Sequence, residues 1–457
     1  MADVLLISCN ITREPYPVYP LGMAMVAHAA REQGHRVTEL DMLRMNLSCE
    51  RVAEMAESLA PDVIGLSLRN IDNLDSCSLH AYVDYYDQLV RALREVSQAA
   101  IVLGGCGYSL FPEVLLERLG GDYGVVGEGE AAFCRLLEDV GMGKSPTDRI
   151  LQGRVVVTNK MMAVPARDAD LASYYLQEGG MLNVQSKRGC PLRCAYCNYP
   201  LLEGRTYRFR PPEDVVDEID MLISVYGADF YAIADSVFND QQGQYLSVVE
   251  ELVRRGIHVP WMAFFRPQRF QREQVDLLRR SGLHAVEWGT DCATDATLEG
   301  MQKDFTWEEV RHSNRLFSES GIACAHFIIF GGPGETDDTV REGLDNIEKL
   351  DRCAVFAFLG VRILPGTAIQ RRAVEEGVIC SNQSLLEPVF YHSPDVRRDS
   401  LHTSVSNAFA DRLDRVYPPG DGAEKIQVFH KMGRRGPVWD LLCADGRTRR
   451  RGKTSTR

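Results

Sequence analysis

The sequence predicts an α/β protein in which a doubly wound, Rossmann-like sheet is followed by a partial (β/α)6 barrel of the TIM type and a small mixed, partly helical C-terminal region. Three observations predict this class. Short β-rich runs alternate with amphipathic helical stretches over residues 1–145. Six further strand-like runs recur within residues 181–375, each ending in polar, charged or glycine residues. The chain has 457 residues, a length that suggests two or three domains.

The first 145 residues are expected to form alternating strands and helices, with one parallel sheet covered on both faces. The expected strands are residues 4–10, 36–41, 61–70, 99–107 and 122–130, and the expected helices are residues 21–35, 51–60, 85–97 and 131–141. Sheets of this kind bind ligands at the carboxyl ends of their strands. Those ends carry Asn10, Ser67, Arg69, Asn70, the run Gly104–Gly105–Cys106–Gly107, and the run Gly127–Glu128–Gly129–Glu130.

The last of these ends, GEGEAA, fits the loose dinucleotide pattern G-x-G-x-x-A. It belongs to the last unit of the sheet rather than the first. Glu128 and Glu130 would also place two carboxylates where a pyrophosphate should lie. The pattern therefore argues only weakly for a nucleotide.

The six runs of the second domain are residues 182–189, 230–239, 260–267, 284–291, 324–334 and 356–366. A βα barrel has its active site on the loops at the carboxyl ends of the strands, and six units leave it open at one side. Residues 146–180 are expected to form a connector. Residues 376–457 form the C-terminal region, whose basic tail from Arg447 to Arg457 is expected to be disordered.

Composition excludes several classes of function. The net charge of −13 argues against nucleic-acid binding, which needs clustered Lys and Arg. No signal peptide is visible and no apolar run approaches the roughly 20 residues that span a bilayer, so a cytoplasmic protein without an integral membrane segment is expected. Most of the 13 cysteines are scattered, as reduced cysteines are, rather than spaced as a disulfide framework.

Only the stretch KRGCPLRCAYCNYP, residues 187–200, has cysteines at ligand spacing. Cys190, Cys194 and Cys197 follow the first barrel strand and can converge on one cluster. Thiolates select zinc or iron–sulfur centres, and no fourth Cys or His follows until His258. Three thiolates on a [4Fe–4S] cluster leave one iron open to a small molecule. The alternatives are a zinc site completed from afar and cysteines buried in a core.

The spacing C-x3-C-x-(aromatic)-C resembles the signature of the radical S-adenosylmethionine (SAM) enzymes. The resemblance implies that Cys190, Cys194 and Cys197 hold a [4Fe–4S] cluster whose open iron binds SAM. Further segments are similar to those that contact SAM in this family: ADSVFN, EWGTDCA, FIIFGGPGET and VRILPGT. The SAM-binding residues implied are Tyr196, Asp235, Ser236, Asn239, Glu287, Gly289, Asp291, Gly331, Gly332, Pro333, Arg362 and Leu364.

The first domain resembles the cobalamin-binding domain that precedes the barrel in B12-dependent members of this family. The cobalamin-binding residues implied are Asn10, Tyr19, Ser67, Leu68, Arg69, Asn70, Gly104, Gly105, Cys106, Gly127, Glu128, Gly129 and Glu130. The loop CNITREPYPVYPLG departs from the D-x-H-x-x-G motif of cobalamin mutases because it has no His. Cobalt is therefore expected to lack a protein imidazole ligand.

The resemblance implies that reductive cleavage of SAM gives a 5′-deoxyadenosyl radical, which takes a hydrogen atom from an unactivated carbon of a small molecule or lipid. That carbon is then methylated with the help of cobalamin. No catalytic side chain beyond the cofactor ligands is expected, and an external donor such as flavodoxin or ferredoxin supplies the electron. The alternatives are a rearrangement, ring contraction or oxidative cyclisation without methylation, and a non-enzymatic corrinoid-binding or redox-sensing protein.

Overall fold

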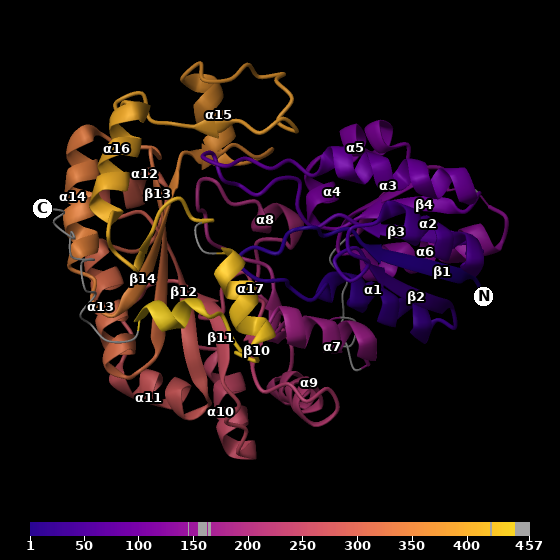
Figure 1. Cartoon of the computed structure of the whole chain (residues 1–457), viewed down its shortest axis with the longest axis horizontal. Helices are drawn as coiled ribbons and strands as arrows, with labels where there is room; N and C mark the ends of the chain where they lie inside the picture. The colour runs from indigo at the N-terminus through magenta and orange to yellow at the C-terminus, as the bar shows by residue number, and fades with distance from the viewer. Residues whose placement is uncertain (145, 154–161, 163–165, 421–422, 444–457) are drawn as a thin grey trace, which may run out of the picture.

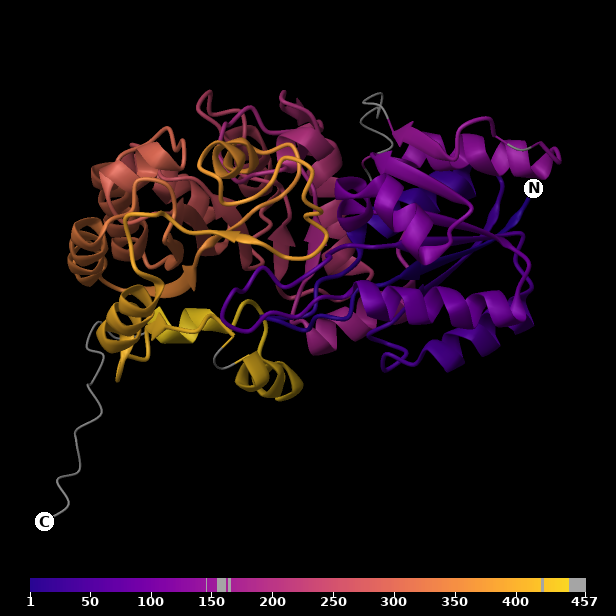
Figure 2. The ribbon, with the colours of Figure 1, turned by 90° about the horizontal axis from the view of Figure 1, so that it is seen from above.

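The computed structural model describes residues 1–144, 146–153, 162, 166–420 and 423–443. These residues form two α/β lobes that lie side by side, one built on each predicted sheet (Figures 1 and 2). The predicted α/β class is confirmed. The basic tail, residues 447–457, lies outside the described residues.

The first lobe is a six-stranded parallel sheet of order β2-β1-β3-β4-β5-β6. Its strands are β1 (Asp3–Ser8), β2 (Arg36–Asp41), β3 (Val63–Ser67), β4 (Ala100–Gly104), β5 (Tyr123–Gly127) and β6 (Ile150–Gly153). Its helices are α1 (Leu21–Glu32), α2 (Cys49–Leu59), α3 (Val83–Val96), α4 (Cys106–Leu110), α5 (Pro112–Leu119) and α6 (Gly129–Gly141), and they cover both faces of the sheet (Figure 2).

Two observations revise the predicted connector. Strand β6 pairs with β5, so the first sheet extends beyond residue 145. Helix α7 (Ala169–Glu178) begins where the side chain of Asp168 accepts a hydrogen bond from the Leu171 amide. The rest of the predicted connector, residues 154–161 and 163–165, lies outside the described residues.

The second lobe is a seven-stranded parallel sheet that starts at β7 and runs in order β7-β10-β11-β12-β13-β14-β17. Its strands are β7 (Leu182–Val184), β10 (Tyr231–Ile233), β11 (Trp261–Phe265), β12 (Leu283–Asp291), β13 (Ala323–Phe330), β14 (Cys353–Leu359) and β17 (Arg415–Val416). The first three lie within their predicted runs, whereas β12 and β13 begin one residue before theirs and β14 begins three residues before its run. The seventh comes from the predicted C-terminal region and pairs with β14 at the edge of the sheet.

The outer layer of this lobe is helical, as expected for βα units. Its helices are α9 (Pro212–Ser224), α10 (Leu246–Arg255), α11 (Arg272–Arg280), α13 (Trp307–Glu319) and α14 (Asp337–Glu348). The other helical elements follow strand ends or the sheet: α8 (Tyr199–Leu202), α12 (Asp295–Gly300), α15 (Ala368–Glu375), α16 (Arg398–Phe409), α17 (Ala423–Lys431) and the 3-10 helix η2 (Trp439–Cys443). Two small antiparallel pairs are β8 (Lys187–Arg188) with β9 (Arg208–Phe209), and β15 (Val361–Arg362) with β16 (Phe390–Tyr391).

The barrel interior is plugged at the amino ends of its strands by Trp439 of η2. Trp439 packs in a separate apolar group, which we call the barrel-floor cluster: Met181, Phe230, Met262, Ala285, Ala325, Ala354, Phe356 and Trp439. The three alanines lie on adjacent strands and leave room for the indole. The barrel interior opens instead at the carboxyl ends of the strands, towards the first lobe.

Buried polar contacts tie the two lobes together. The guanidinium of Arg188 donates to Glu130 and lies 3.3 Å from Glu128, and Arg208 pairs with Glu128 as well. The buried Arg362 guanidinium donates to Asp72 of the first lobe at 3.0 Å. Removing one partner of such a buried pair typically costs about 3–5 kcal/mol, so these contacts fix the lobes in one arrangement.

Candidate functional site

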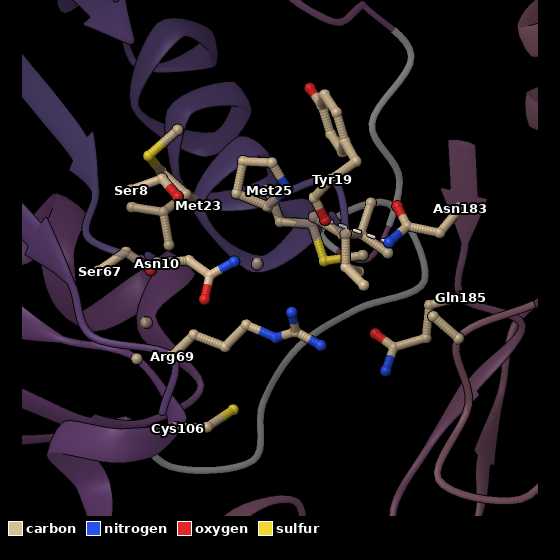
Figure 3. A pocket seen from close by; sticks show the side chains of 18 of the residues that line it. Ser8, Asn10, Tyr19, Met23, Met25, Ser67, Arg69, Cys106, Asn183 and Gln185 are labelled. Carbon is tan, nitrogen blue, oxygen red and sulfur yellow. Dashed lines mark hydrogen bonds between the residues drawn. The ribbon is translucent and has the colours of Figure 1, made fainter. Parts of the chain in front are cut away.

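A cavity of about 390 Å³ opens between the carboxyl ends of the first sheet and the mouth of the barrel (Figure 3). One wall comes from the ends of β1, β3, β4 and β5 and from the amino end of α1. The other wall comes from β7, β10 and β11, including Asn183, Ala232 and Phe264. One continuous space thus joins the places where a doubly wound sheet and a βα barrel each bind ligands.

The structure brings together most of the residues assigned to cobalamin from the sequence. Eleven of them line the cavity: Asn10, Tyr19, Ser67, Arg69, Gly104, Gly105, Cys106, Gly127, Glu128, Gly129 and Glu130. Leu68 and Asn70 do not line it. Leu68 is buried beneath Gly105, and the Asn70 carbonyl accepts a hydrogen bond from Tyr86 at 2.6 Å.

The eleven residues that line the cavity form a wall that we call the cradle, and two of its glycines shape it in different ways. Gly105 has a φ of +92°, and a Cβ there would lie 2.6 Å from the Leu68 carbonyl oxygen, so only glycine fits the turn. A Cβ on Gly104 would have only the Val125 carbonyl oxygen within 4 Å, at 3.8 Å. The face of Gly104 is therefore open to the cavity, as a flat macrocycle lying on the backbone requires.

Polar side chains point into the cavity from both lobes (Figure 3). Arg69 extends towards Gln185, Asn10 lies beside it, and Asn183 donates to the Tyr19 carbonyl at 3.1 Å. The Arg69 guanidinium donates no hydrogen bond to any residue described by the structure. No histidine is found among the described residues that line the cavity, in agreement with the absence of His from loop 9–22.

Glu128 and Glu130 have a different role from the one suggested by their place in the GEGEAA loop. Both carboxylates face the cavity but pair with Arg188 and Arg208 from the barrel side. Glu128 and Glu130 therefore join the two lobes next to the cradle. The partner arginines were not predicted from the sequence, and neither were two polar residues of the cavity: Asn183 in β7, and Gln185, which directly follows this strand.

The three clustered cysteines lie in the loop between β8 and α8, at the barrel mouth, and all are free thiols. Cys190 is buried, whereas Cys194 and Cys197 are partly exposed. Burial raises the pKa of Cys197 to about 12, and the nearby Cys194 adds to this effect. Within the described residues no three Cys, His, Asp or Glu side chains converge closely enough to hold a single metal ion. Three thiolates from one loop are the kind of donor set that holds an iron–sulfur cluster.

A polar network touches the cysteine loop from β12. The Tyr196 hydroxyl donates to Asp291 at 2.6 Å, and Lys303 pairs with Asp291. Lys303 also donates to the Gly289 carbonyl at 3.3 Å and to the Cys194 sulfur at 3.5 Å. Asp291 has a φ of +60°, a strained conformation of the kind found at functional sites. The structure thus brings together Tyr196, Gly289 and Asp291, three of the residues assigned to SAM from the sequence, and adds Lys303, which was not predicted.

The remaining residues assigned to SAM are spread around the mouth. Asp235 lines the cavity and accepts from the Ser186 amide at 2.7 Å, and Ser236 lies 3.5 Å from the Gly189 carbonyl. Asn239 accepts from and donates to the Arg266 backbone through two hydrogen bonds.

The glycine turn after β13 packs against α12. It consists of Gly331, Gly332 and Pro333, and a Cβ on Gly300 would lie 2.0 Å from the Pro333 oxygen. Arg362 is occupied by Asp72, and Leu364 is partly buried.

Glu287 faces the barrel interior and contacts both ends of the described chain. One carboxylate oxygen accepts from the Tyr16 hydroxyl at 3.2 Å and from the Trp439 indole at 3.0 Å. Burial raises the pKa of Glu287 from 4.5 to about 7, although the hydrogen bonds from Trp439 and Tyr16 partly oppose this shift. A carboxylic acid with this pKa destabilises the fold when it ionises.

Replacing Glu287 with Gln should therefore change the pH dependence of stability. In the wild type the native state binds the extra proton between pH 4.5 and 7, so stability falls as the pH rises through this window. The amide oxygen of Gln accepts the same two hydrogen bonds without ionising. Urea unfolding at pH 5 and pH 8 should show the variant gaining about 2–3 kcal/mol relative to the wild type at the higher pH. The exposed Glu117→Gln serves as the control, and equal pH slopes for wild type and Glu287→Gln would contradict the expectation.

Comparisons with known proteins agree with this geometry. Residues 7–137 match the family described as B12 binding domain, and residues 184–347 match the Radical SAM superfamily. The tryptophan 2-C-methyltransferase of Streptomyces laurentii is 23% identical over 437 residues, which cover 79% of this chain and 73% of that protein. The anaerobic magnesium-protoporphyrin IX monomethyl ester cyclase of Rubrivivax gelatinosus is 26% identical, over 71% of this chain and 60% of that protein.

A solved structure with the same two-lobed fold is that of the radical SAM methyltransferase TsrM from Kitasatospora setae with cobalamin and a [4Fe–4S] cluster bound. It superimposes with a TM-score of 0.85 at 22% identity and covers 96% of this chain and 97% of that chain. None of the helices in the described ranges combines the length and apolar character needed to cross a membrane. With a B12-binding domain joined to a radical SAM domain, three clustered thiols at the barrel mouth and one cavity between the lobes, the chain belongs to the cobalamin-dependent radical SAM enzymes.

Proposed function

We propose that this enzyme transfers a methyl group to carbon in a small molecule that binds between the two lobes. The observation that carries the proposal is the single cavity lined by both the predicted cobalamin cradle and the barrel mouth. A cofactor held by the first lobe and a cofactor held by the second would both face a substrate placed there. The methyltransferase among the relatives, which aligns with 79% of this chain, supports this assignment.

The residues of this chain would hold each component in place. Cys190, Cys194 and Cys197 would ligate the cluster, and the network of Tyr196, Asp291 and Lys303 would border SAM. Asn10, Arg69 and Gly104 would contact the corrin. When bound, these cofactors supply the radical and methyl-transfer chemistry, and the protein supplies binding and orientation.

The substrate side of the cavity is apolar. Met181, Met262 and Phe264 line it from the barrel, and Phe264 is 44% exposed although it is a large aromatic residue. An apolar wall of this kind excludes water from a radical intermediate and binds an apolar or aromatic part of the substrate. A polar head is expected to reach Asn183 or Gln185, whose side chains face the same space.

The test follows the methyl group of SAM. Anaerobic protein reconstituted with iron, sulfide and cobalamin is incubated with CD3-labelled SAM, a reductant and candidate apolar metabolites. Methylation predicts S-adenosylhomocysteine together with a product heavier by one CD3 group. Formation of 5′-deoxyadenosine with neither of these would instead support a cyclase or rearrangement, as in the cyclase relative. No turnover of SAM at all would support a non-enzymatic corrinoid-binding protein.

A further inference from the structure

A second groove, of about 580 Å³, reaches the cysteine loop from outside the barrel. Cys194 and Cys197 line it, together with residues from the turn that leads into α15. None of the residues assigned to SAM or cobalamin lines this groove, as far as the structure describes the chain. Two of the three thiols are therefore reached from this groove, whereas none of the three clustered cysteines is among the residues that line the cavity between the lobes, as far as the structure describes the chain.

The groove carries an excess of positive charge. Arg193, Arg205 and Arg371 line it and are exposed. None of the three forms an ion pair with a residue in the described ranges, and no Asp or Glu is among the described lining residues. The whole chain has a net charge of −13, so this local excess of positive charge runs against the average.

Apolar surface lies beside the arginines. Leu201 of α8 lines the groove and is 51% exposed, and Pro191 forms part of the same wall. Exposed apolar side chains rimmed by charged ones are typical of protein interaction sites. The patch lies directly over two of the thiols that would hold the cluster.

We propose that this groove is the docking surface for an acidic, flavodoxin-type electron carrier. The inference rests on the proposed function, because that chemistry begins when the cluster accepts an electron. One electron passes from the fully reduced flavin of the carrier to the cluster, which goes from the 2+ to the 1+ state, and the flavin is oxidised by one electron. A carrier with negative charge around its cofactor is attracted by the three arginines, although the protein as a whole would repel it. The apolar ring edge of a flavin fits beside Leu201.

Docking at the groove also keeps the electron carrier away from the cavity in which the substrate would react. The groove and the substrate cavity share no lining residue in the described ranges, and Arg188 pairs with Glu130 where the two lobes meet beside the cavity. A carrier bound in the groove leaves the substrate cavity and its contents undisturbed. Reduction can therefore take place while the substrate is enclosed.

The experiment measures the rate of cluster reduction in the full-length, reconstituted protein by anaerobic stopped-flow absorbance. The test variant is Arg193→Gln/Arg205→Gln/Arg371→Gln. The matched control, Arg51→Gln/Arg135→Gln/Arg279→Gln, removes three exposed arginines on α2, α6 and α11 and changes the net charge equally. The reductants are reduced flavodoxin and dithionite, a small molecule that needs no docking surface. Iron content and circular dichroism verify that each variant is folded and loaded.

The test variant should lose at least tenfold in its second-order rate with flavodoxin at low salt, and its rate should depend less on ionic strength. The control variant and all rates with dithionite should stay within about twofold of the wild type. An unchanged rate with flavodoxin, or an equal loss in the control variant, would overturn the proposal. The proposal would also be overturned if an acidic ferredoxin, but not flavodoxin, reduced the cluster at a rate that depends on the three arginines. If the wild-type protein assembled no cluster, the proposed function itself would be overturned. This outcome is therefore distinguishable from a failure of the docking proposal alone.

Discussion

Replacing Cys194 with Ala is expected to abolish both iron loading and the cleavage of SAM. Cys194 is one of three thiols at the barrel mouth, and its sulfur accepts a hydrogen bond from Lys303 at 3.5 Å. Two remaining thiols cannot hold a four-iron cluster that already lacks a fourth protein ligand. Iron and sulfide analysis should fall to background, as should 5′-deoxyadenosine formed by the reduced protein.

The matched control is Cys380→Ala, which removes an exposed thiol outside the loop. This variant should keep its iron and its activity at wild-type levels. Circular dichroism should show both variants folded, because Cys194 is partly exposed and its loop is anchored separately by the Ala195 amide, which donates to the Met301 carbonyl at 2.9 Å. Continued formation of 5′-deoxyadenosine by Cys194→Ala would show that the cluster is held elsewhere.

Replacing Gly104 with Leu should weaken cobalamin binding about 100-fold, which corresponds to about 2.7 kcal/mol. The backbone of Gly104 accepts a side chain, since the nearest atom to an added Cβ lies 3.8 Å away. The isobutyl group then extends into the cavity and occupies space that the corrin needs. The affinity is measured by titrating apoprotein with cobalamin and following its absorbance.

The same substitution at Gly141 provides the control for Gly104→Leu. Gly141 lies at the exposed end of α6 in the same lobe, and no atom lies within 4 Å of an added Cβ. Cobalamin affinity should stay unchanged in Gly141→Leu, and both variants should unfold at similar temperatures. Wild-type affinity in Gly104→Leu would mean that the corrin lies elsewhere.

The fold could be predicted where strands are long, buried and separated by amphipathic helices. Strand β13 has eight residues and ends in a glycine turn, so its run is distinct in the sequence. Strands β6 and β17 escaped prediction for a physical reason. Residues 150–153 are exposed or only partly buried at a sheet edge, and β17 contains only two residues, so neither carries a hydrophobic period.

The site could be predicted where its residues share one sequence motif or one strand end. Cys190, Cys194 and Cys197 needed no structure because their spacing is local. Lys303 could not be found in this way, since it reaches Cys194 across 109 residues from a turn with no motif of its own. Leu68 does not line the cavity although Ser67 and Arg69 do, because successive side chains of an extended segment point to opposite sides.

The contacts of Glu287 also constrain the order in which the chain can mature during synthesis. Its carboxyl group bridges Tyr16, which is made early, and Trp439, which is made after every strand of the second sheet. The first lobe can fold while the ribosome is still working, but the barrel-floor cluster stays without its indole until residue 439 has emerged. During that interval Met181, Phe230 and Phe356 lack their apolar cover, and the nascent barrel presents the kind of surface that chaperones bind.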